Sequence, residues 1–244
     1  MILALDIGNS ATKAGIFSGA ALVRTARLAA FDEEALSAFI GGAELTGVGI
    51  ASVVPERTPW AVAASEQLCE APPLVIDAEL RLPFKMAYRT PQTLGADRLA
   101  AAAGAVSLFP DDDQIVTIDA GTAVTFEVVA SGAYRGGVIA AGPDLLSRGL
   151  ATGTAQLPQV PAEMPARVIG GTTTEALQAG VMWGFVEAVR GLTRQIASEL
   201  GGQPVVMATG GWAPLLADHI PEISRVEPHL VLHGIRALLA LNER

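Results

Sequence analysis

Near its N-terminus the chain reads Ile2-Leu-Ala-Leu-Asp6-Ile-Gly8-Asn9-Ser10-Ala-Thr12-Lys13, and a degenerate copy follows at Ile115-Val-Thr-Ile-Asp119-Ala-Gly121-Thr122-Ala123-Val-Thr125. Each copy consists of a short apolar run, an Asp, one further residue, a Gly and small polar residues, which predicts a strand, a tight turn and a return strand. One Asp-x-Gly bend alone is also typical of an ordinary hairpin turn. Its recurrence at long separation indicates a duplicated architecture.

The two bends have the chemistry of an anion site. Their Gly residues let a ligand approach the backbone closely, and the small hydroxyl and amide side chains, with the N–H groups of the turn, can donate hydrogen bonds to an anion. An Asp repels a bare phosphate, but it suits a cation, bound directly or through water, that holds the phosphate. We therefore expect two related halves that hold one nucleotide from opposite sides.

The composition limits the classes of protein that fit. The chain has 244 residues, of which 50% are hydrophobic and 17% charged, as expected of a compact soluble protein with a large core or two small domains. No run approaches the roughly 18 apolar residues of a membrane helix, and Asp6 interrupts any signal peptide. The net charge of −9 argues against nucleic acid or an anionic membrane as partner. The single cysteine, Cys69, rules out an intrachain disulfide framework and favours a reducing cytoplasm.

Strand and helix patterns alternate along the chain, which predicts an α/β fold in which helices cover a sheet. The expected strands lie at 2–7, 12–18, 21–28, 48–55, 74–77, 115–119, 124–130, 136–140 and 205–209, and the expected helices at 33–40, 60–69 and 95–109. Thr172-Thr-Thr-Glu175 is a capping box, which predicts the start of a long helix ending near Leu200. Within that helix Ala176, Gly180 and Gly184 form a stripe of small residues for either intrachain packing or a subunit interface.

Two further motifs are candidates for chemistry. Thr209-Gly210-Gly211 ends a strand and opens a helix, a geometry that suits a nucleoside or phosphate. An ordinary strand–helix connection has the same sequence pattern. Asp97 and Arg98 begin the helix at 95–109, where an acidic residue is favoured by the helix dipole alone. In the functional interpretation Asp97 orients the proton of an attacking alcohol and Arg98 binds a carboxylate or phosphate. Phosphoryl transfer depends mostly on positioning and electrostatics, so one carboxylate base suffices.

Together these motifs resemble the type III pantothenate kinases, which belong to the acetate/sugar kinase, heat-shock ATPase and actin superfamily. The resemblance covers nearly the whole chain, and its most specific block runs from Tyr88 to Arg98. It is carried by Asp6-Ile-Gly-Asn9, Ser52-Val-Val-Pro55, Tyr88-x-x-Pro91-x-x-Leu94-Gly-Ala-Asp97-Arg98, Asp119-x-Gly-Thr122-Ala-x-Thr125, Gly136-Gly137-x-Ile139, Thr154-Ala-x-Leu157-Pro158, Gly170-x-x-Thr173 and Thr209-Gly-Gly211. It implies two similar ribonuclease-H-like, actin-like lobes, at residues 1–111 and 112–244, with mixed sheets flanked by helices and a nucleotide cleft between them.

The resemblance also implies an activity, in which the γ-phosphoryl group of ATP passes to the terminal hydroxyl of pantothenate as the first step of coenzyme A biosynthesis. Such kinases are cytoplasmic homodimers that use Mg²⁺ with ATP and a monovalent cation, K⁺ or NH₄⁺. The implied catalytic base is Asp97. The implied ATP contacts are Asp6, Gly8, Asn9, Ser10, Thr12, Lys13 and Thr122; the pantothenate contacts are Tyr88, Gly95, Ala96, Asp97, Arg98 and Thr173; the cation ligands are Asp119 for the monovalent ion and Asp6 for Mg²⁺, directly or through water.

Some positions depart from the pattern of these kinases, and other functions fit the same fold. Ser10 replaces the usual Thr, Thr90 replaces an Asn before the proline, and Ala141-Gly142-Pro143 replaces a Pro-Gly order. None of these changes removes a proposed catalytic group. The alternatives are a kinase for another small alcohol, a phosphatase on the same fold, and a regulatory protein that binds nucleotide without transferring phosphate. The presence of Asp6, Asp97, Arg98 and Asp119 favours an enzyme.

Overall fold

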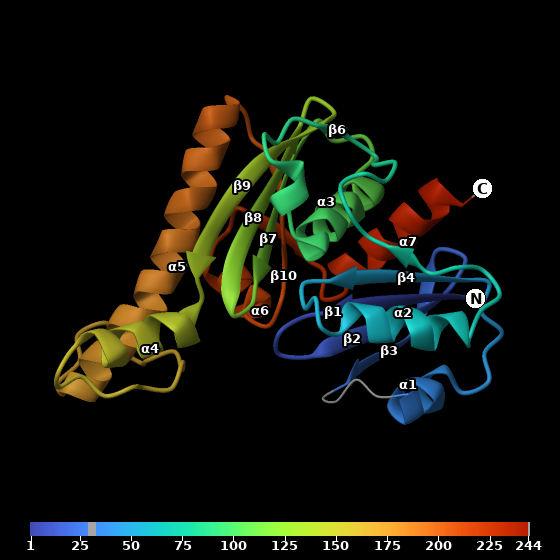
Figure 1. Ribbon diagram of the computed structural model, residues 1–244. Helices are drawn as coiled ribbons and strands as arrows, with labels where there is room; N and C mark the ends of the chain where they lie inside the picture. Colours follow the sequence, from blue (N-terminus) through green and yellow to red (C-terminus); the bar gives the residue numbers. More distant parts are fainter. Residues whose placement is uncertain (29–32, 244) are drawn as a thin grey trace. The chain divides into compact units, whose positions relative to one another are not determined.

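The computed structural model describes residues 1–28 and 33–243 (Figure 1). The chain forms two compact units: unit 1 comprises Met1–Asp112, Gly132–Arg135 and His229–Arg244, and unit 2 comprises Asp113–Ser131 and Gly136–Pro228. This division differs from the sequence-based lobes, 1–111 and 112–244, because the segment at 132–135 and the C-terminal helix pack with unit 1. Among the described helices, none is both long and apolar enough to cross a membrane.

Unit 1 is built on a five-stranded mixed sheet in the order β3-β2-β1-β4-β5. Strand β1 pairs antiparallel with β2 and parallel with β4, and β2 pairs antiparallel with β3. The predicted hairpin at 2–7 and 12–18 is therefore confirmed. The elements of unit 1 are β1 (Ile2–Ile7), β2 (Thr12–Ser18), β3 (Ala21–Leu28), α1 (Glu33–Ile40), β4 (Gly47–Ser52), α2 (Thr58–Glu66), β5 (Leu74–Val75), β6 (Lys85–Met86), the 3₁₀ turn η1 (Pro91–Thr93), α3 (Ala96–Leu108) and α7 (Leu230–Asn242).

The two faces of this sheet are packed differently. Because side chains alternate along a strand, Leu3, Leu5 and Ile7 point to one face, where they pack with apolar residues of α1 and α2. On the other face Gly15 and Gly49 lie against α7: a Cβ added to Gly49 would come 2.5 Å from Ile235 Cγ2, and one added to Gly15 would come 2.9 Å from Leu232 Cδ1. The glycines thus let α7 approach the sheet closely. Asp6 occupies this second face, at the end of β1.

Helix α3 crosses α7 at two glycines (Figure 1). A Cβ on Gly104 would lie 2.5 Å from the Leu230 carbonyl oxygen, and one on Gly234 would lie 1.7 Å from the Ala100 carbonyl oxygen. Six alanines of α3 are buried around this crossing, namely Ala96, Ala100, Ala101, Ala102, Ala103 and Ala105. Small side chains allow the two helix backbones to touch, which fixes where α3 begins relative to the sheet.

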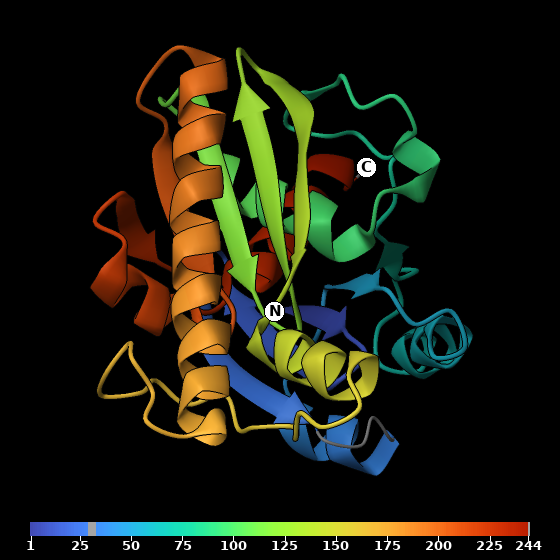
Figure 2. The same cartoon turned by 90° about the vertical axis from the view of Figure 1, so that its left-hand side faces the viewer.

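The second sheet is mixed and has the order β11-β10-β7-β8-β9-β6, of which β6 and the start of β9 are assigned to unit 1. Strands β7 and β8 are antiparallel, and β10 runs parallel to β7 and β11. Helices α5 and α6 pack on one face of this sheet through Phe185, Val189 and Leu216 (Figure 2). The elements are β7 (Gln114–Ala120), β8 (Ala123–Ala130), β9 (Ala133–Ala141), α4 (Pro143–Gly153), α5 (Thr173–Leu200), β10 (Val205–Thr209), α6 (Ala213–His219) and β11 (Ile223–Val226). The α/β prediction with two mixed sheets is confirmed.

The capping box that predicts α5 is present in the structure. The Thr172 hydroxyl accepts a hydrogen bond from the Glu175 backbone N–H at 3.2 Å, and Glu175 Oε2 accepts one from the Gly171 N–H at 2.7 Å. The helix ends at Gly201, whose φ of 67° is a left-handed conformation that glycine adopts without strain. Helix α4 was not predicted, since its Gly149 and Gly153 weaken a helical pattern.

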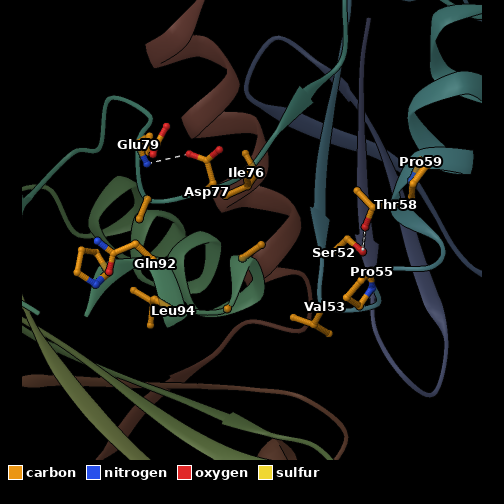
Figure 3. A pocket seen from close by; sticks show the side chains of 14 residues that line it. Ser52, Val53, Pro55, Thr58, Pro59, Ile76, Asp77, Glu79, Gln92 and Leu94 are labelled. Carbon is orange, nitrogen blue, oxygen red and sulfur yellow. Dashed lines mark hydrogen bonds between the residues drawn. The ribbon is translucent and has the colours of Figure 1, made fainter. Parts of the chain in front are cut away.

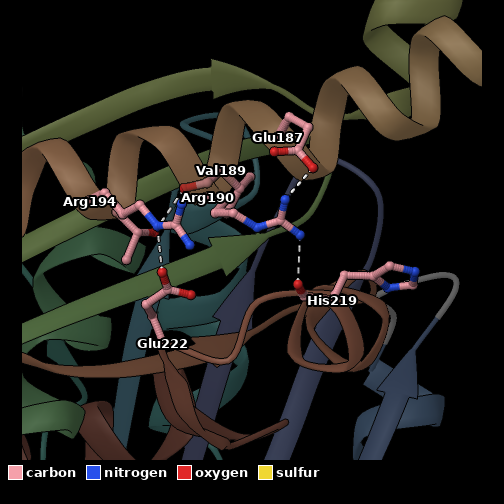
Figure 4. Close-up of polar contacts among 7 residues, drawn as sticks. Glu187, Val189, Arg190, Arg194, His219 and Glu222 are labelled. Atoms are coloured by element: carbon pink, nitrogen blue, oxygen red, sulfur yellow. Dashed lines mark hydrogen bonds and ion pairs between the residues drawn. The ribbon is translucent and has the colours of Figure 1, made fainter.

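Ionic and polar contacts join α5 to the segment around α6 and β11 (Figure 4). Arg190 forms an ion pair with Glu187 and donates to the His219 carbonyl oxygen at 2.7 Å. Arg194 Nε donates to Glu222 Oε1 at 2.6 Å. This last hydrogen bond lowers the pKa of the Glu222 carboxyl below its ordinary value, against an opposing effect of burial.

Replacing Glu222 by Gln is expected to lower stability at pH 7 by about 0.5 kcal/mol, because Arg194 is exposed and the pair is screened by water. A carboxyl with a depressed pKa stabilises the fold above its unfolded pKa and loses that contribution as the pH falls through the folded pKa. The difference between wild type and variant should therefore shrink as the pH falls through the lowered pKa of Glu222. Urea unfolding at pH 7 and pH 3 measures it, with Glu199→Gln, the same change at an exposed position of α5, as the control. An equal difference at both pH values would contradict the assignment.

Candidate functional site

The first Asp-x-Gly bend joins β1 to β2 in unit 1. The Gly8 N–H donates to the Ala11 carbonyl oxygen at 3.1 Å and closes the turn, at whose tip Asn9 and Ser10 are exposed. The Asp6 side chain is 12% exposed, and its carboxylate lies 3.8 Å from Lys13 Nζ. The bend thus groups a carboxylate, an ammonium and two small polar side chains.

Thr12 lies beside this bend with an unsatisfied hydroxyl. Thr12 is 1% exposed, and its Oγ1 has no hydrogen-bond partner in the described structure. A buried hydroxyl without a partner costs free energy, so its position at a predicted ligand site calls for a partner supplied from outside the chain. An oxygen or a cation-bound water of a nucleotide would provide one.

The block of residues around Asp97 lies at the same edge of unit 1. The Val53 N–H, at the end of β4, donates to the Ile7 carbonyl oxygen at 3.1 Å, and a Cβ placed on Gly95 would lie 3.6 Å from Val53 Cγ1. Helix α3 therefore begins where β4 ends, next to the end of β1. Because Asp6 and α3 are on the same side of the sheet, the structure brings the first bend and the Asp97 block together.

The first turn of α3 holds Asp97 in a defined position. Asp97 Oδ1 accepts a hydrogen bond from the Arg98 backbone N–H at 2.7 Å. A Cβ at Gly95 would lie 2.5 Å from the same oxygen, so any other residue at this position would displace the Asp97 carboxylate. The carboxylate is half-buried in the first turn of α3. These features match a base that is held in a fixed position.

Arg98 and Tyr88 are brought together by a residue that sequence analysis missed. Arg98 Nη2 donates to the Tyr134 hydroxyl at 3.3 Å, and the Tyr88 ring packs edge-on against Tyr134 with 6.0 Å between ring centroids. Among the described residues Tyr134 is the largest fully buried side chain, and it belongs to unit 1 through the segment Gly132–Arg135. It is 36 positions from Arg98 in sequence, so no local pattern marks it.

A pocket of about 820 Å³ adjoins the start of α3. Figure 3 shows Asp77, Glu79 and Gln92 on one side of it and Ser52 and Thr58 on the other. Gly95 and Ala96, two of the predicted acceptor contacts, are among its lining residues. Its volume is in the range of small-molecule sites. Asp97, Arg98 and Tyr88 are not among its lining residues.

The second Asp-x-Gly bend is part of a crowded set of turns in unit 2. The Gly121 N–H donates to the Ala123 carbonyl oxygen at 3.0 Å, and the Gly142 N–H donates to the Thr122 carbonyl oxygen at 3.0 Å. A Cβ on Gly142 would lie 2.5 Å from the Gly121 carbonyl oxygen, and one on Gly210 would lie 2.6 Å from Asp119 Oδ1. The turns after β7, β9 and β10 therefore converge on Asp119 and Thr122.

Glycine at positions 142 and 210 lets these turns pack closely around the second bend. Within the described residues no group of three or more His, Cys, Asp or Glu side chains forms a metal cluster. Single carboxylates such as Asp6 and Asp119 instead suit cations that take most of their ligands from phosphate and water. Thr173, the other predicted acceptor contact, is the exposed first residue of α5, and its role stays a prediction.

Comparison with curated proteins identifies the family. The profile of type III pantothenate kinase matches residues 2–195. The chain is 38% identical to the type III pantothenate kinase of Chlorobaculum parvum, over 98% of this chain and 94% of that protein. It is 36% identical to the type III pantothenate kinase of Anaeromyxobacter sp. strain K, over 98% of both chains.

Solved structures show the same fold at lower identity. A protein described as a putative Baf family transcriptional activator from Campylobacter jejuni superposes with a TM-score of 0.60 at 18% identity, over 98% of this chain and 97% of that one. A ROK hexokinase from Thermus thermophilus superposes with a TM-score of 0.54 at 15% identity, over 98% and 97% of the two chains. These likenesses support the fold alone, whereas the sequence matches establish that this chain belongs to the type III pantothenate kinase family.

Proposed function

We propose that this chain transfers the γ-phosphoryl group of ATP to the terminal hydroxyl of pantothenate and so forms 4′-phosphopantothenate, the first step of coenzyme A biosynthesis. The observation that carries the proposal is the placement of Asp97 at the start of α3, against the strand ends that also carry the Asp6–Lys13 bend. A phosphoryl donor and an alcohol acceptor bound at one strand edge need only one carboxylate between them.

In this reaction Asp97 accepts the proton of the pantothenate hydroxyl as its oxygen attacks the γ-phosphorus, while the bond from that phosphorus to the bridging oxygen of ADP breaks. Arg98 binds the pantothenate carboxylate, because a guanidinium fork matches a carboxylate in charge and shape. Tyr88, Gly95 and Ala96 are assigned as further acceptor contacts. Thr173, from unit 2, is assigned as a further acceptor contact.

The nucleotide contacts are assigned to the two bends. Gly8, Asn9 and Ser10 offer backbone and side-chain donors to the phosphates, Lys13 offers its charge and Thr12 its unsatisfied hydroxyl, and Thr122 is the contact from the second bend. Asp6 fits Mg²⁺, directly or through water, and Asp119 fits a monovalent cation, K⁺ or NH₄⁺. Bound cations neutralise the charge of the phosphates that Asp6 and Asp119 would otherwise repel.

The assembly is proposed to be a homodimer in the cytoplasm. The small-residue stripe of α5 is exposed, and a Cβ at Gly180 or Gly184 would meet no atom within 4 Å in the described chain. The stripe is therefore open to a second copy rather than used for intrachain packing. Cys69 is a buried free thiol, which fits a reducing compartment. Sedimentation velocity tests the dimer, and a monomer at micromolar concentration would contradict it.

The proposed activity is tested by measuring ADP formation and the phosphorylated product with ATP, Mg²⁺, K⁺ and a panel of acceptors. We expect turnover with pantothenate and little with glucose, N-acetylglucosamine or acetate. Replacing K⁺ by a bulky organic cation should lower the rate if Asp119 holds a monovalent ion. Nucleotide binding by calorimetry without any phosphorylated product would favour the regulatory alternative, and turnover with a different alcohol would reassign the acceptor.

A further inference from the structure

Tyr134 makes two contacts with residues that the proposed function assigns to the acceptor. Its hydroxyl accepts a hydrogen bond from Arg98 Nη2 at 3.3 Å, and its ring receives the edge of Tyr88 at an interplanar angle of 77°. Both partners are half-buried, whereas Tyr134 is 0% exposed. One buried side chain thus contacts two residues that the proposed function assigns to the acceptor.

The backbone around Tyr134 is held as firmly as its side chain. Strand β6 pairs parallel with the start of β9, with Met86 opposite Tyr134, and the Ala87 N–H donates to the Tyr134 carbonyl oxygen at 3.1 Å. Tyr88 follows two residues after Met86, so the same strand pair that fixes Tyr134 also sets the position of Tyr88. Phe84 also packs against the Tyr134 ring, with 5.7 Å between the two ring centroids. Tyr134 therefore has little freedom to follow a movement of Arg98.

A guanidinium group binds a carboxylate well only when its plane is oriented correctly, because two parallel N–H donors must meet two oxygens. Arg98 is a long side chain on the first turn of a helix, and an arginine left to itself samples many rotamers. A hydrogen bond from one end of the guanidinium to a rigid, buried hydroxyl restricts that plane. Pre-arranging a binding group in this way increases affinity by reducing the entropy lost on binding.

We propose that Tyr134 is a positioning residue that orients Arg98 through its hydroxyl and Tyr88 through its ring, and so sets the affinity for the acceptor carboxylate. The inference rests on the proposed function, because it takes Arg98 as the carboxylate ligand. Tyr134 is fully buried, and the proposal assigns it no contact with the reacting hydroxyl or the phosphate. Its loss should consequently change acceptor binding more than the chemical step.

The test is Tyr134→Phe, which removes the hydroxyl and keeps the ring that Tyr88 and Phe84 contact. We expect the KM for pantothenate to rise roughly 3- to 30-fold, with kcat within about 2-fold of wild type. The matched control is Ser65→Ala, which removes another fully buried hydroxyl of unit 1, one that donates to the Ala61 carbonyl oxygen at 2.7 Å. Both variants lose a buried hydrogen bond, but only Tyr134→Phe should change the KM.

A double-mutant cycle with Arg98→Lys tests whether Tyr134→Phe changes the KM through Arg98. Lysine keeps the positive charge but lacks the planar fork, so Tyr134→Phe should change the KM by less than about 2-fold in the Arg98→Lys background. The inference is overturned if Tyr134→Phe leaves the KM unchanged, if it lowers kcat and kcat/KM equally, or if its effect is the same in both backgrounds. Absence of pantothenate turnover by the wild type would instead overturn the proposed function, which keeps the two failures distinct.

Discussion

Replacing Asp97 by Asn is expected to lower kcat with pantothenate by about 10²–10⁴-fold, the usual effect of removing a general base. The amide has nearly the same size as the carboxylate, and its oxygen can still accept the hydrogen bond from the Arg98 N–H that Asp97 Oδ1 accepts at 2.7 Å. The start of α3 should therefore stay in place. What is lost is the ability to take the proton of the attacking hydroxyl, so the KM for ATP should change little.

The measurement is steady-state kinetics at saturating ATP and pantothenate, with thermal unfolding recorded on the same samples. Asp112→Asn is the matched control, since it makes the same chemical change in an exposed turn of unit 1 and should keep full activity. A loss of kcat in Asp97→Asn with unchanged unfolding assigns the carboxylate to the reaction. Normal turnover would refute the role of Asp97 and leave it as a helix cap.

Gly234→Ala should cause the largest loss of stability, roughly 3 kcal/mol, because the added Cβ cannot be accommodated by a side-chain rotation. The methyl group would lie 1.7 Å from the Ala100 carbonyl oxygen and 2.5 Å from its carbon, and both are backbone atoms of α3. Helices α3 and α7 must therefore separate. Separation would also shift the first turn of α3, so catalytic activity should fall along with stability.

Urea unfolding of both proteins gives the free-energy difference, which for a chain of this size corresponds to a fall in Tm of about 6–12 °C. Gly191→Ala is the control: it lies in the exposed part of α5, and its Cβ would meet no atom within 4 Å. That substitution should stabilise the protein by about 0.5–1 kcal/mol through helix propensity. Equal stability of Gly234→Ala and wild type would contradict the close backbone contact between Gly234 and Ala100.

The strands and helices that the sequence predicted correctly are those whose sequence pattern is local. The hairpin at 2–7 and 12–18, the strand at 21–28 and the helix at 33–40 coincide with β1, β2, β3 and α1, because alternation, a glycine bend and helical spacing lie within a few residues. The capping box that begins α5 and the glycine that ends it are equally local. The two-residue strand β6 and the glycine-containing helix α4 carry too weak a pattern to be found in this way.

The sequence by itself determined the duplicated bend, the α/β class, and the set of residues carrying the family resemblance, since each of these is a pattern of neighbouring residues. Only the tertiary structure decided that the C-terminal helix packs with unit 1, that glycines at the α3–α7 crossing place Asp97 beside the first bend, and that Tyr134 contacts both Arg98 and Tyr88. These contacts join residues distant along the chain. They depend on close packing between backbones, which no local spacing records.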